Sequence, residues 1–392
     1  SVSLGFIHMP APPFAVYHQR RLVMPFRFLP SSTADTFTNR NTLDEVVASD
    51  IHDSDTYDRV FAQYRFNAGT SDFVVGLHSF AEDRLMVFNR NSIHLVANTT
   101  NLKNASTKLL TDEVGCLARK SIKQVGNQVI FLSDNGVYGT QFLDEYNLRG
   151  TETPLSEPIN ETFTLINKDL VSNSVAVYFD NRYYLALPLN SIDENNQVVT
   201  ATANNAIIIY NFLNNQWESV DRVNNQNFHI SNMIVAGEGE NRGVYVINNL
   251  GGIHRLDHNE EGKDIVITQV GGDQEIIDIA GLIKTRQYTV QSLERKRWRE
   301  FDLHVQSSDT NTSNFDIDFE TENPDAIDTL GSLSSFNNGL LAIDEDVSIR
   351  GRIGNRRGYG IQFTFKNTIG RPIIRAIEVE GSTTMRSTNK AI

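Results

Sequence analysis

The fold is decided by the stretch Val129-Ile130-Phe131-Leu132-Ser133-Asp134-Asn135-Gly136-Val137-Tyr138. In it, four consecutive apolar residues lead through a short polar turn into further residues that favour β-structure. Asp, Asn and Gly tolerate the positive φ angles that a tight hairpin turn requires. The stretch therefore predicts two antiparallel strands joined by a tight turn.

The same pattern recurs along the chain. It appears as Arg84-Leu85-Met86-Val87-Phe88 before Ser92-Ile93-His94-Leu95-Val96, and as Val244-Tyr245-Val246-Ile247 before Ile253-His254-Arg255-Leu256. A longer variant begins at Arg182-Tyr183-Tyr184-Leu185-Ala186-Leu187. The copies are spaced at roughly 45–65 residues, which overlaps the spacing of the blades of a β-propeller, about 40–50 residues of four strands each.

Sheets that are hydrophobic on both faces need a neighbour on each side, and closing them into a ring removes exposed edges. We therefore predict an all-β chain that forms a β-propeller of about six four-stranded blades with an additional C-terminal β region. Residues 1–280 are assigned to the blades, because no linker-like composition precedes that point. Residues 281–392 are assigned to a last blade or to an appended β-sandwich-like region.

Composition limits the possible partners. The 392-residue chain carries 48 acidic and 35 basic side chains, a formal net charge of −13. This excess of negative charge argues against a protein that binds nucleic acid through its phosphates. No stretch is apolar enough to span a bilayer and no secretion signal is visible, so we expect no membrane anchor. The single cysteine, Cys116, excludes an intramolecular disulfide and is expected to be a small buried hydrophobe.

Sequence motifs of known catalytic classes are not found. His254 and His258 flank a polar turn and are expected to be turn residues rather than metal ligands. The run Asp50-Ile51-His52-Asp53-Ser54-Asp55-Thr56-Tyr57-Asp58 lacks the glycine and the terminal glutamate of an EF-hand loop, so a solvated loop is favoured over calcium binding. We predict no enzymatic activity, no cofactor and no metal.

Basic residues gather at two places near the C-terminal end of the chain. Because the remainder is acidic, we predict that these residues contact acidic patches of a neighbouring subunit. A solvated strand face and a contact with nucleic acid are the alternatives left open. The candidate subunit-contact residues are Arg295, Lys296, Arg297, Arg299, Arg352, Arg356 and Arg357.

Several sequence segments resemble segments of a known protein family. The main one is Gly115-Cys116-Leu117-Ala118 followed by Val125-Gly126-Asn127-Gln128-Val129-Ile130-Phe131-Leu132-Ser133-Asp134-Asn135-Gly136-Val137-Tyr138. Others are Gly76-Leu77-His78-Ser79-Phe80, Arg295-Lys296-Arg297-Trp298 and Arg357-Gly358-Tyr359-Gly360-Ile361-Gln362. They resemble the β-propeller tail nozzle or hub proteins of short-tailed bacteriophages, which include the packaged-DNA stabilisation type.

The resemblance implies a structural component of the virion tail that is assembled in the host cytoplasm. It implies a homo-oligomeric ring, a hexamer, around the DNA exit channel, through which genomic DNA passes without specific binding. It also implies contacts with the tail adaptor and with tail fibre or spike proteins. The resemblance transfers no catalytic residues.

Two other functions are compatible with a propeller. One is a receptor- or glycan-binding tail propeller that presents aromatic residues such as Tyr183, Tyr184 and Trp217 on a loop face. The other is a polysaccharide-degrading propeller enzyme, which requires paired carboxylates at a separation of roughly 5–10 Å that a sequence does not reveal.

Overall fold

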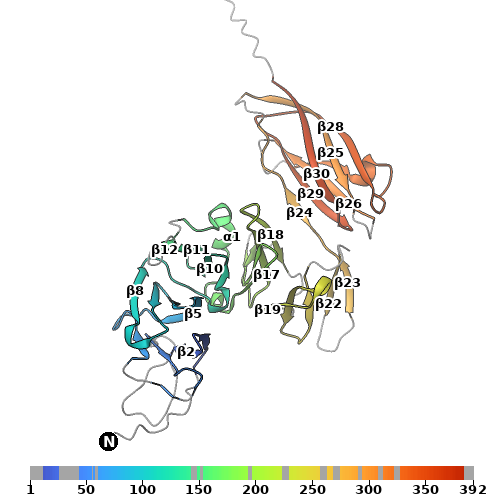
Figure 1. Ribbon diagram of the computed structural model, residues 1–392. Helices are drawn as coiled ribbons and strands as arrows, with labels where there is room; N and C mark the ends of the chain where they lie inside the picture. Colours follow the sequence, from blue (N-terminus) through green and yellow to red (C-terminus); the bar gives the residue numbers. More distant parts are fainter. Residues whose placement is uncertain are drawn as a thin grey trace, which may run out of the picture. The chain divides into compact units, whose positions relative to one another are not determined.

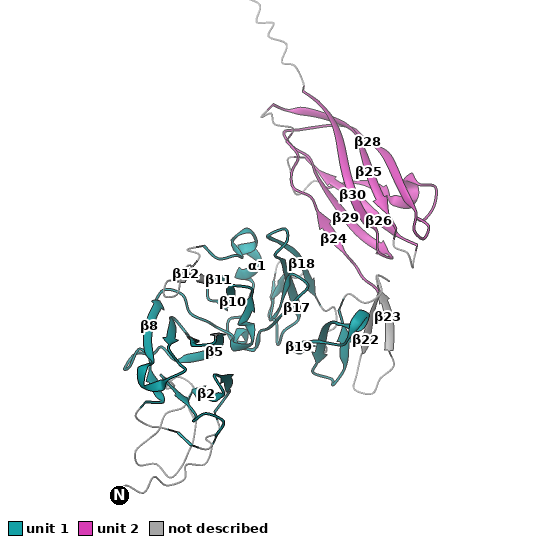
Figure 2. Ribbon diagram, viewed as in Figure 1, with its two compact units in different colours: residues 1–256 teal, residues 257–392 magenta. Residues whose placement is uncertain are grey.

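The computed structural model of the chain (Figure 1) describes residues 12–25, 44–54, 56–57, 61–142, 148–150, 153–192, 197–222, 229–256, 263–267, 274–289, 294–307, 312–321 and 327–383. The chain divides into two compact units, residues 1–256 and residues 257–392 (Figure 2). Strands dominate both units. Among the described residues, no helix has the length and apolar character needed to cross a membrane.

The first unit consists of antiparallel sheets in which strands that follow one another in the sequence are paired. We call these sheets blades one to five. Blade one contains β1 (Val16–His18), β2 (Arg21–Pro25), β3 (Glu45–Ala48) and β4 (Gln63–Arg65). Blade two contains β5 (Val74–Ala81), β6 (Arg84–Asn89), β7 (Ile93–Ala97) and β8 (Ser106–Thr111). Blade three contains β9 (Lys123–Val125), β10 (Gln128–Ser133), β11 (Gly136–Phe142) and β12 (Leu148–Gly150).

The later blades follow the same plan with one insertion. Blade four contains β13 (Val175–Phe179), β14 (Arg182–Leu187), β17 (Ala206–Asn211) and β18 (Gln216–Arg222). The hairpin β15 (Ser191–Ile192) and β16 (Val198–Val199) is inserted between β14 and β17. Blade five contains β19 (Ile230–Ala236), β20 (Gly243–Asn248) and β21 (Ile253–Arg255). The connections hold α1 (Asn160–Thr164) and the short 3₁₀ helices η2 (Leu102–Asn104), η3 (Arg119–Ser121), η4 (Glu157–Ile159), η5 (Val171–Asn173) and η6 (Gly239–Asn241).

The repeated sequence phrase explains the hairpins. In blade three Ser133 pairs with Gly136, so the turn lies at the predicted Asp-Asn position. In other blades the strand before the turn ends in a buried asparagine, Asn211 or Asn248. The side-chain oxygen of Asn248 accepts hydrogen bonds from the backbone amides of Leu250 and Gly252 at 3.0 and 2.7 Å. The side chain thus satisfies turn amides that the sheet leaves unpaired.

Each blade packs face to face on the next. Separate hydrophobic cores join blades one and two, two and three, three and four, and four and five. Residues on the two sides of these cores include Val23 and Leu85, Phe88 and Phe131, Leu132 and Leu185, and Val177 and Met233. Because both faces of a blade are buried, the sequences of its central strands are continuous runs of apolar residues.

The first strands of successive blades lie side by side. β1 contacts β5, β5 contacts η3, β9 contacts β13, and β13 contacts β19. Meanders that pack face to face with their first strands converging are the blades of a β-propeller. The predicted all-β propeller fold is therefore confirmed. Among the described residues no hydrophobic core joins blade one to blade five, so the blade count and the closure of the ring stay predictions.

The second unit is a sandwich of two sheets (Figure 2). One sheet holds β24 (Leu282–Lys284), β29 (Gln362–Ile369), β26 (Asn314–Glu320) and β27 (Asp328–Ser332). The other holds β28 (Asp346–Gly358), β25 (Lys296–Gln306) and β30 (Ile373–Thr383), and α2 (Leu333–Phe336) follows β27. Their inner faces share one core, in which the rings of Phe301 and Phe363 lie 5.9 Å apart.

The boundary between the units differs from the predicted position between residues 280 and 281. A hairpin of β22 (Lys263–Ile267) and β23 (Gln274–Asp278) precedes the sandwich and is grouped with it. The first unit therefore ends at residue 256. Of the two arrangements that the sequence left open for the C-terminal region, the two sheets around one core correspond to the sandwich.

Candidate functional site

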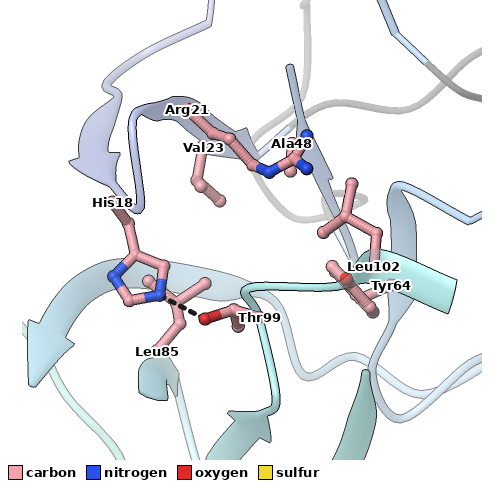
Figure 3. A pocket seen from close by; sticks show the side chains of 8 residues that line it. All are labelled: His18, Arg21, Val23, Ala48, Tyr64, Leu85, Thr99 and Leu102. Atoms are coloured by element: carbon pink, nitrogen blue, oxygen red, sulfur yellow. Dashed lines mark hydrogen bonds between the residues drawn. The ribbon is translucent and has the colours of Figure 1, made fainter. Parts of the chain in front are cut away.

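The converging first strands bring polar side chains of different blades together. The imidazole of His18 on β1 lies between two hydroxyl groups, with Nδ1 2.7 Å from Ser79 Oγ and Nε2 2.7 Å from Thr99 Oγ1 (Figure 3). Burial lowers the pKa of His18, although the nearby Asp83 acts in the opposite direction. A neutral imidazole can donate through one nitrogen and accept through the other, so it joins blade one to blade two.

Positive charge gathers beside β5 where the acidic chain would not suggest it. Arg119, Lys120 and Lys123 lie on η3 and β9, and His78 Nε2 lies 3.2 Å from Gln124 Oε1. Burial, and then the charge of Lys120, lowers the pKa of Lys123. Neither Lys120 nor Lys123 forms an ion pair with any residue in the described part of the chain. This surface can attract an anion, and the basic run at residues 119–123 was the signal that sequence reasoning missed.

Asp72 is the centre of a buried hydrogen-bond network between blades one and two. One carboxylate oxygen accepts hydrogen bonds from Ser92 Oγ at 2.5 Å and from Asn67 Nδ2 at 2.8 Å. The same oxygen accepts from Asn89 Nδ2 at 3.2 Å, and the other accepts from the backbone amide of Asn91 at 2.8 Å. Four donors on one carboxylate compensate for its burial.

The network contains a serine, a histidine and an aspartate, but their order does not suit nucleophilic catalysis. His94 Nε2 lies 3.0 Å from Ser92 Oγ, while Asp72 binds the serine and not the imidazole. A catalytic triad requires the carboxylate to hold the histidine. Ser92 is also only 2 % exposed. The arrangement therefore stabilises the turn between β6 and β7.

The predicted subunit-contact residues are brought together by the sandwich. β25 pairs with β28, which sets Arg297 opposite Arg357. Arg295, Arg299, Arg352, Arg356 and Arg357 are exposed. Lys296 is an exception, because it is buried and its ammonium group donates to the carbonyls of Glu294 and Tyr359, both at 3.1 Å. The burial of Lys296 therefore contradicts its prediction as a subunit-contact residue.

Acidic residues pair with several arginines of β28. Arg350 lies 2.8 Å from Glu300, and Arg352 lies 3.8 Å from the same carboxylate. Arg356 forms an ion pair of 2.7 Å with Asp328 on the other sheet. The side chain of Arg352 nevertheless remains 89 % exposed, which leaves it able to bind a partner. The surface is thus one of mixed charge and not a continuous cationic patch.

The aromatic residues suggested for glycan binding do not lie on a loop face. Tyr183 and Tyr184 on β14 are 0 and 3 % exposed, and they face the cores on opposite sides of blade four. Tyr183 donates a hydrogen bond to the carbonyl of Ser121 at 2.8 Å. Trp217 packs against the core of blades three and four, and its Nε1 donates to the carbonyl of Leu155 at 2.8 Å. The predicted aromatic platform is therefore wrong.

The remaining sequence candidates that the structure describes have structural roles. Cys116 is buried, and burial raises the pKa of its thiol to about 12. Asp134 lies in the hairpin turn of blade three and forms an ion pair with Arg90 of blade two, so this turn contacts the neighbouring blade. His254 lies 3.2 Å from Asn248 Nδ2, whereas His258 lies outside the described residues, as do Asp55 and Asp58. No group of three potential metal ligands occurs within the described ranges.

Comparison with known proteins gives only weak structural similarities. No protein-family model matches the chain, and no curated protein matches it significantly. A solved structure of an exo-β-1,3-galactanase from Phanerochaete chrysosporium is 11 % identical over 95 % of this chain and 96 % of its own, with a TM-score of 0.33. The N-terminal domain of Nup159 is 8 % identical over 92 % of this chain and 91 % of its own, with a TM-score of 0.31.

A third solved structure, BamB from Moraxella catarrhalis, is 11 % identical over 65 % of this chain and 88 % of its own, with a TM-score of 0.28. With scores this low, the assignment to the propeller class rests on the sheet order and the blade cores described above.

Proposed function

We propose that this protein is a non-catalytic structural component of the tail of a short-tailed bacteriophage. It forms a homohexameric ring around the DNA exit channel and connects the tail adaptor to fibres or spikes. The main support for the proposal is the position of the sequence segments that resemble the tail proteins. They lie on β5 and on the β10 hairpin of consecutive blades, and on β25 and the end of β28 in the sandwich. The resemblance therefore concerns the framework of both units.

Rigidity and charge would be the working properties of such a part. Blades two, three and four are each covered on both faces by a hydrophobic core, so they resist deformation. The net charge of −13 argues against tight binding of DNA through its phosphates by the chain as a whole. Arg119, Lys120 and Lys123 beside β5 are a local exception, and contacts between them and passing DNA would be few and transient.

Two measurements test the proposal. Mass spectrometry of purified virions from the phage that encodes the chain should detect it in multiple copies, and light scattering of the purified protein should give the mass of a hexamer. Absence from the virion would overturn the proposal. Saturable binding on a glycan array would favour a receptor-binding propeller, and turnover of a capsular polysaccharide would favour an enzyme.

A further inference from the structure

The two sheets of the sandwich differ by one strand. The four-stranded sheet has the order β24-β29-β26-β27, and the three-stranded sheet has the order β28-β25-β30. One side of the sandwich is closed, because Arg356 of β28 forms an ion pair of 2.7 Å with Asp328 of β27 and the rings of Phe301 and Phe336 lie 5.7 Å apart. Since β27 lies beside β28, β24 lies at the opposite side, next to β30. The strand count therefore leaves β24 without a facing strand in the three-stranded sheet.

Apolar side chains at this second side are uncovered. Ile283 of β24 pairs with Phe365 of β29, so both side chains project from the same face of the sheet, towards the core. Phe365 is 3 % exposed, whereas Ile283 is 54 % exposed. Ile377 and Val379 of β30 pack against the same core and are half-buried. We call Ile283, Ile377 and Val379 the open flank of the sandwich.

The backbone beside the open flank is unpaired as well. β30 pairs with β25 along one edge, and no strand in the described part of the chain pairs with its other edge. An unpaired edge presents a row of amide and carbonyl groups that can pair with an added strand. This edge is eleven residues long. Together with the apolar side chains, it forms a docking surface for an extended segment.

The first residues of the chain have the sequence that such a surface requires. In Ser1-Val2-Ser3-Leu4-Gly5-Phe6, apolar residues alternate with small ones. In an extended segment Val2, Leu4 and Phe6 project to one side and could fill the space between the sheets, while the small residues face the other side. Six extended residues span about 20 Å, which is shorter than the edge of β30. The C-terminal residues 384–392 show no such alternation.

We propose that residues 1–6 of one copy add to β30 of a neighbouring copy as the fourth strand of its three-stranded sheet. The donor segment is held to its own blades at its other end, because the carbonyl of Pro13 accepts a hydrogen bond of 2.8 Å from Arg119, whose guanidinium lies 4.9 Å from the centre of the Phe14 ring. Each copy then donates one segment and accepts one. A contact between two different surfaces closes into a ring when the rotation between copies permits it. The choice of a neighbouring copy rests on the ring proposed above.

Two double substitutions in the full chain test the strand addition. Leu4→Asp with Phe6→Asp places charges among apolar side chains, so the mass in solution should fall from that of the oligomer to that of a single chain. Ser1→Asp with Ser3→Asp adds the same charge to the other side of the segment and should leave the oligomer intact. Light scattering measures the mass, and calorimetry checks that both variants fold. An oligomer that survives the first pair, or that both pairs disrupt equally, would overturn the proposal.

Cross-linking separates exchange between copies from insertion within one chain. One variant carries Ser3→Cys and the other carries Glu378→Cys, at an exposed position of β30, while the natural Cys116 is buried. Co-expressed and treated with a short bismaleimide, they should form a dimer that contains one chain of each kind. Ser348→Cys on β28 replaces Glu378→Cys as the control and should give no such dimer. Absence of the mixed dimer, or a cross-link only within a chain that carries both substitutions, would overturn the proposal.

These tests are independent of the tail function, because they use only the purified chain. Absence of the chain from virions would contradict the tail function and leave the strand addition standing. Failure of the strand addition would leave the tail function to be decided by the virion.

Discussion

Asp72 accepts a hydrogen bond of 2.5 Å from Ser92 Oγ, and this contact ties the connection between blades one and two to the turn between β6 and β7. The carboxylate is buried, and the donors that converge on it compensate for that burial. The blade contacts of this protein therefore depend on polar groups as well as on apolar packing.

Removing the Asp72 carboxylate should destabilise the first unit strongly. Asp72→Ala leaves buried donors of Asn67, Asn89 and Ser92 without their acceptor, so we expect a loss of about 3 kcal/mol or more in the free energy of unfolding. Chemical denaturation measures the change. Asp169→Asn, at an exposed position, is the control and should change stability by less than about 0.5 kcal/mol. Equal effects of the two substitutions would contradict this account of the network.

Gly115 should tolerate no side chain. A Cβ atom at this position would lie 2.2 Å from the carbonyl oxygen of Arg90, and the next residue, Cys116, donates its amide to Asn89 at 2.9 Å. Gly115→Ala must therefore push the start of blade three away from blade two, and we expect a loss of stability of about 2–4 kcal/mol. Gly281→Ala is the matched control, because its Cβ would meet only Asn367 at 3.6 Å. A Gly115→Ala protein with an unchanged unfolding midpoint would disprove the close approach.

Protonation of His18 should weaken the contact between blades one and two. Burial lowers its pKa in the folded chain below the value of 6.5 expected for the unfolded chain, so the unfolded state binds a proton first as the pH falls. The stability that depends on neutral His18 is complete above pH 6.5 and is lost as the pH falls towards the folded-state pKa. The free energy of unfolding, measured between about pH 8 and pH 5, should fall more steeply for the natural chain than for His18→Gln. Parallel curves would exclude this role.

The ion pair of Arg90 with Asp134 should couple blades two and three to a modest extent. Arg90 donates two hydrogen bonds to this carboxylate, one of them at 3.0 Å, but both side chains are partly exposed. A double-mutant cycle with Arg90→Ala and Asp134→Asn should give a coupling energy of about 0.5–1 kcal/mol at low salt. In about 1 M sodium chloride the coupling should shrink. A coupling energy of zero at low salt would show that the pair does not link the blades.

The exposed arginines of the sandwich should be needed for assembly. Arg352 and Arg357 lie on β28, and the side chain of Arg352 is 89 % exposed. Reversing both charges, as Arg352→Glu with Arg357→Glu, should reduce the mass in solution from that of the oligomer to that of a single chain, without lowering the unfolding midpoint. Light scattering and calorimetry measure the two quantities. Arg371→Glu is the control, and an oligomer that survives the double substitution would remove these residues from the interface.

The sequence predicted the hairpins well because their determinants are local. A run of apolar residues followed by Ser133, Asp134, Asn135 and Gly136 sets both the strands and the turn, and the observed pairing of Ser133 with Gly136 follows from that chemistry. The propeller class follows from the repetition of the same local unit. The Asp72 network could not be predicted, because the connection that holds Asn67 and Asp72 meets the turn that holds Ser92 only through tertiary contact.

The errors have physical reasons of their own. Tyr183 and Tyr184 were expected on a surface, but β14 is covered on both faces, so each ring enters a different core. The uninterrupted apolar run around them was a sign of this burial. Lys296 stands in a basic run that suggests exposure, yet backbone carbonyls hold its ammonium group inside the sandwich. Such a site arises from tertiary contacts that a linear pattern does not contain.

The proposed tail function is tested most directly by a cryo-electron microscopy reconstruction of the tail of the short-tailed phage from which, on that proposal, the chain comes. The account predicts copies of the blade unit and the sandwich arranged as a ring around the channel through which DNA leaves. A tail reconstruction in which no density fits these two units, together with a purified chain that stays monomeric, would contradict it.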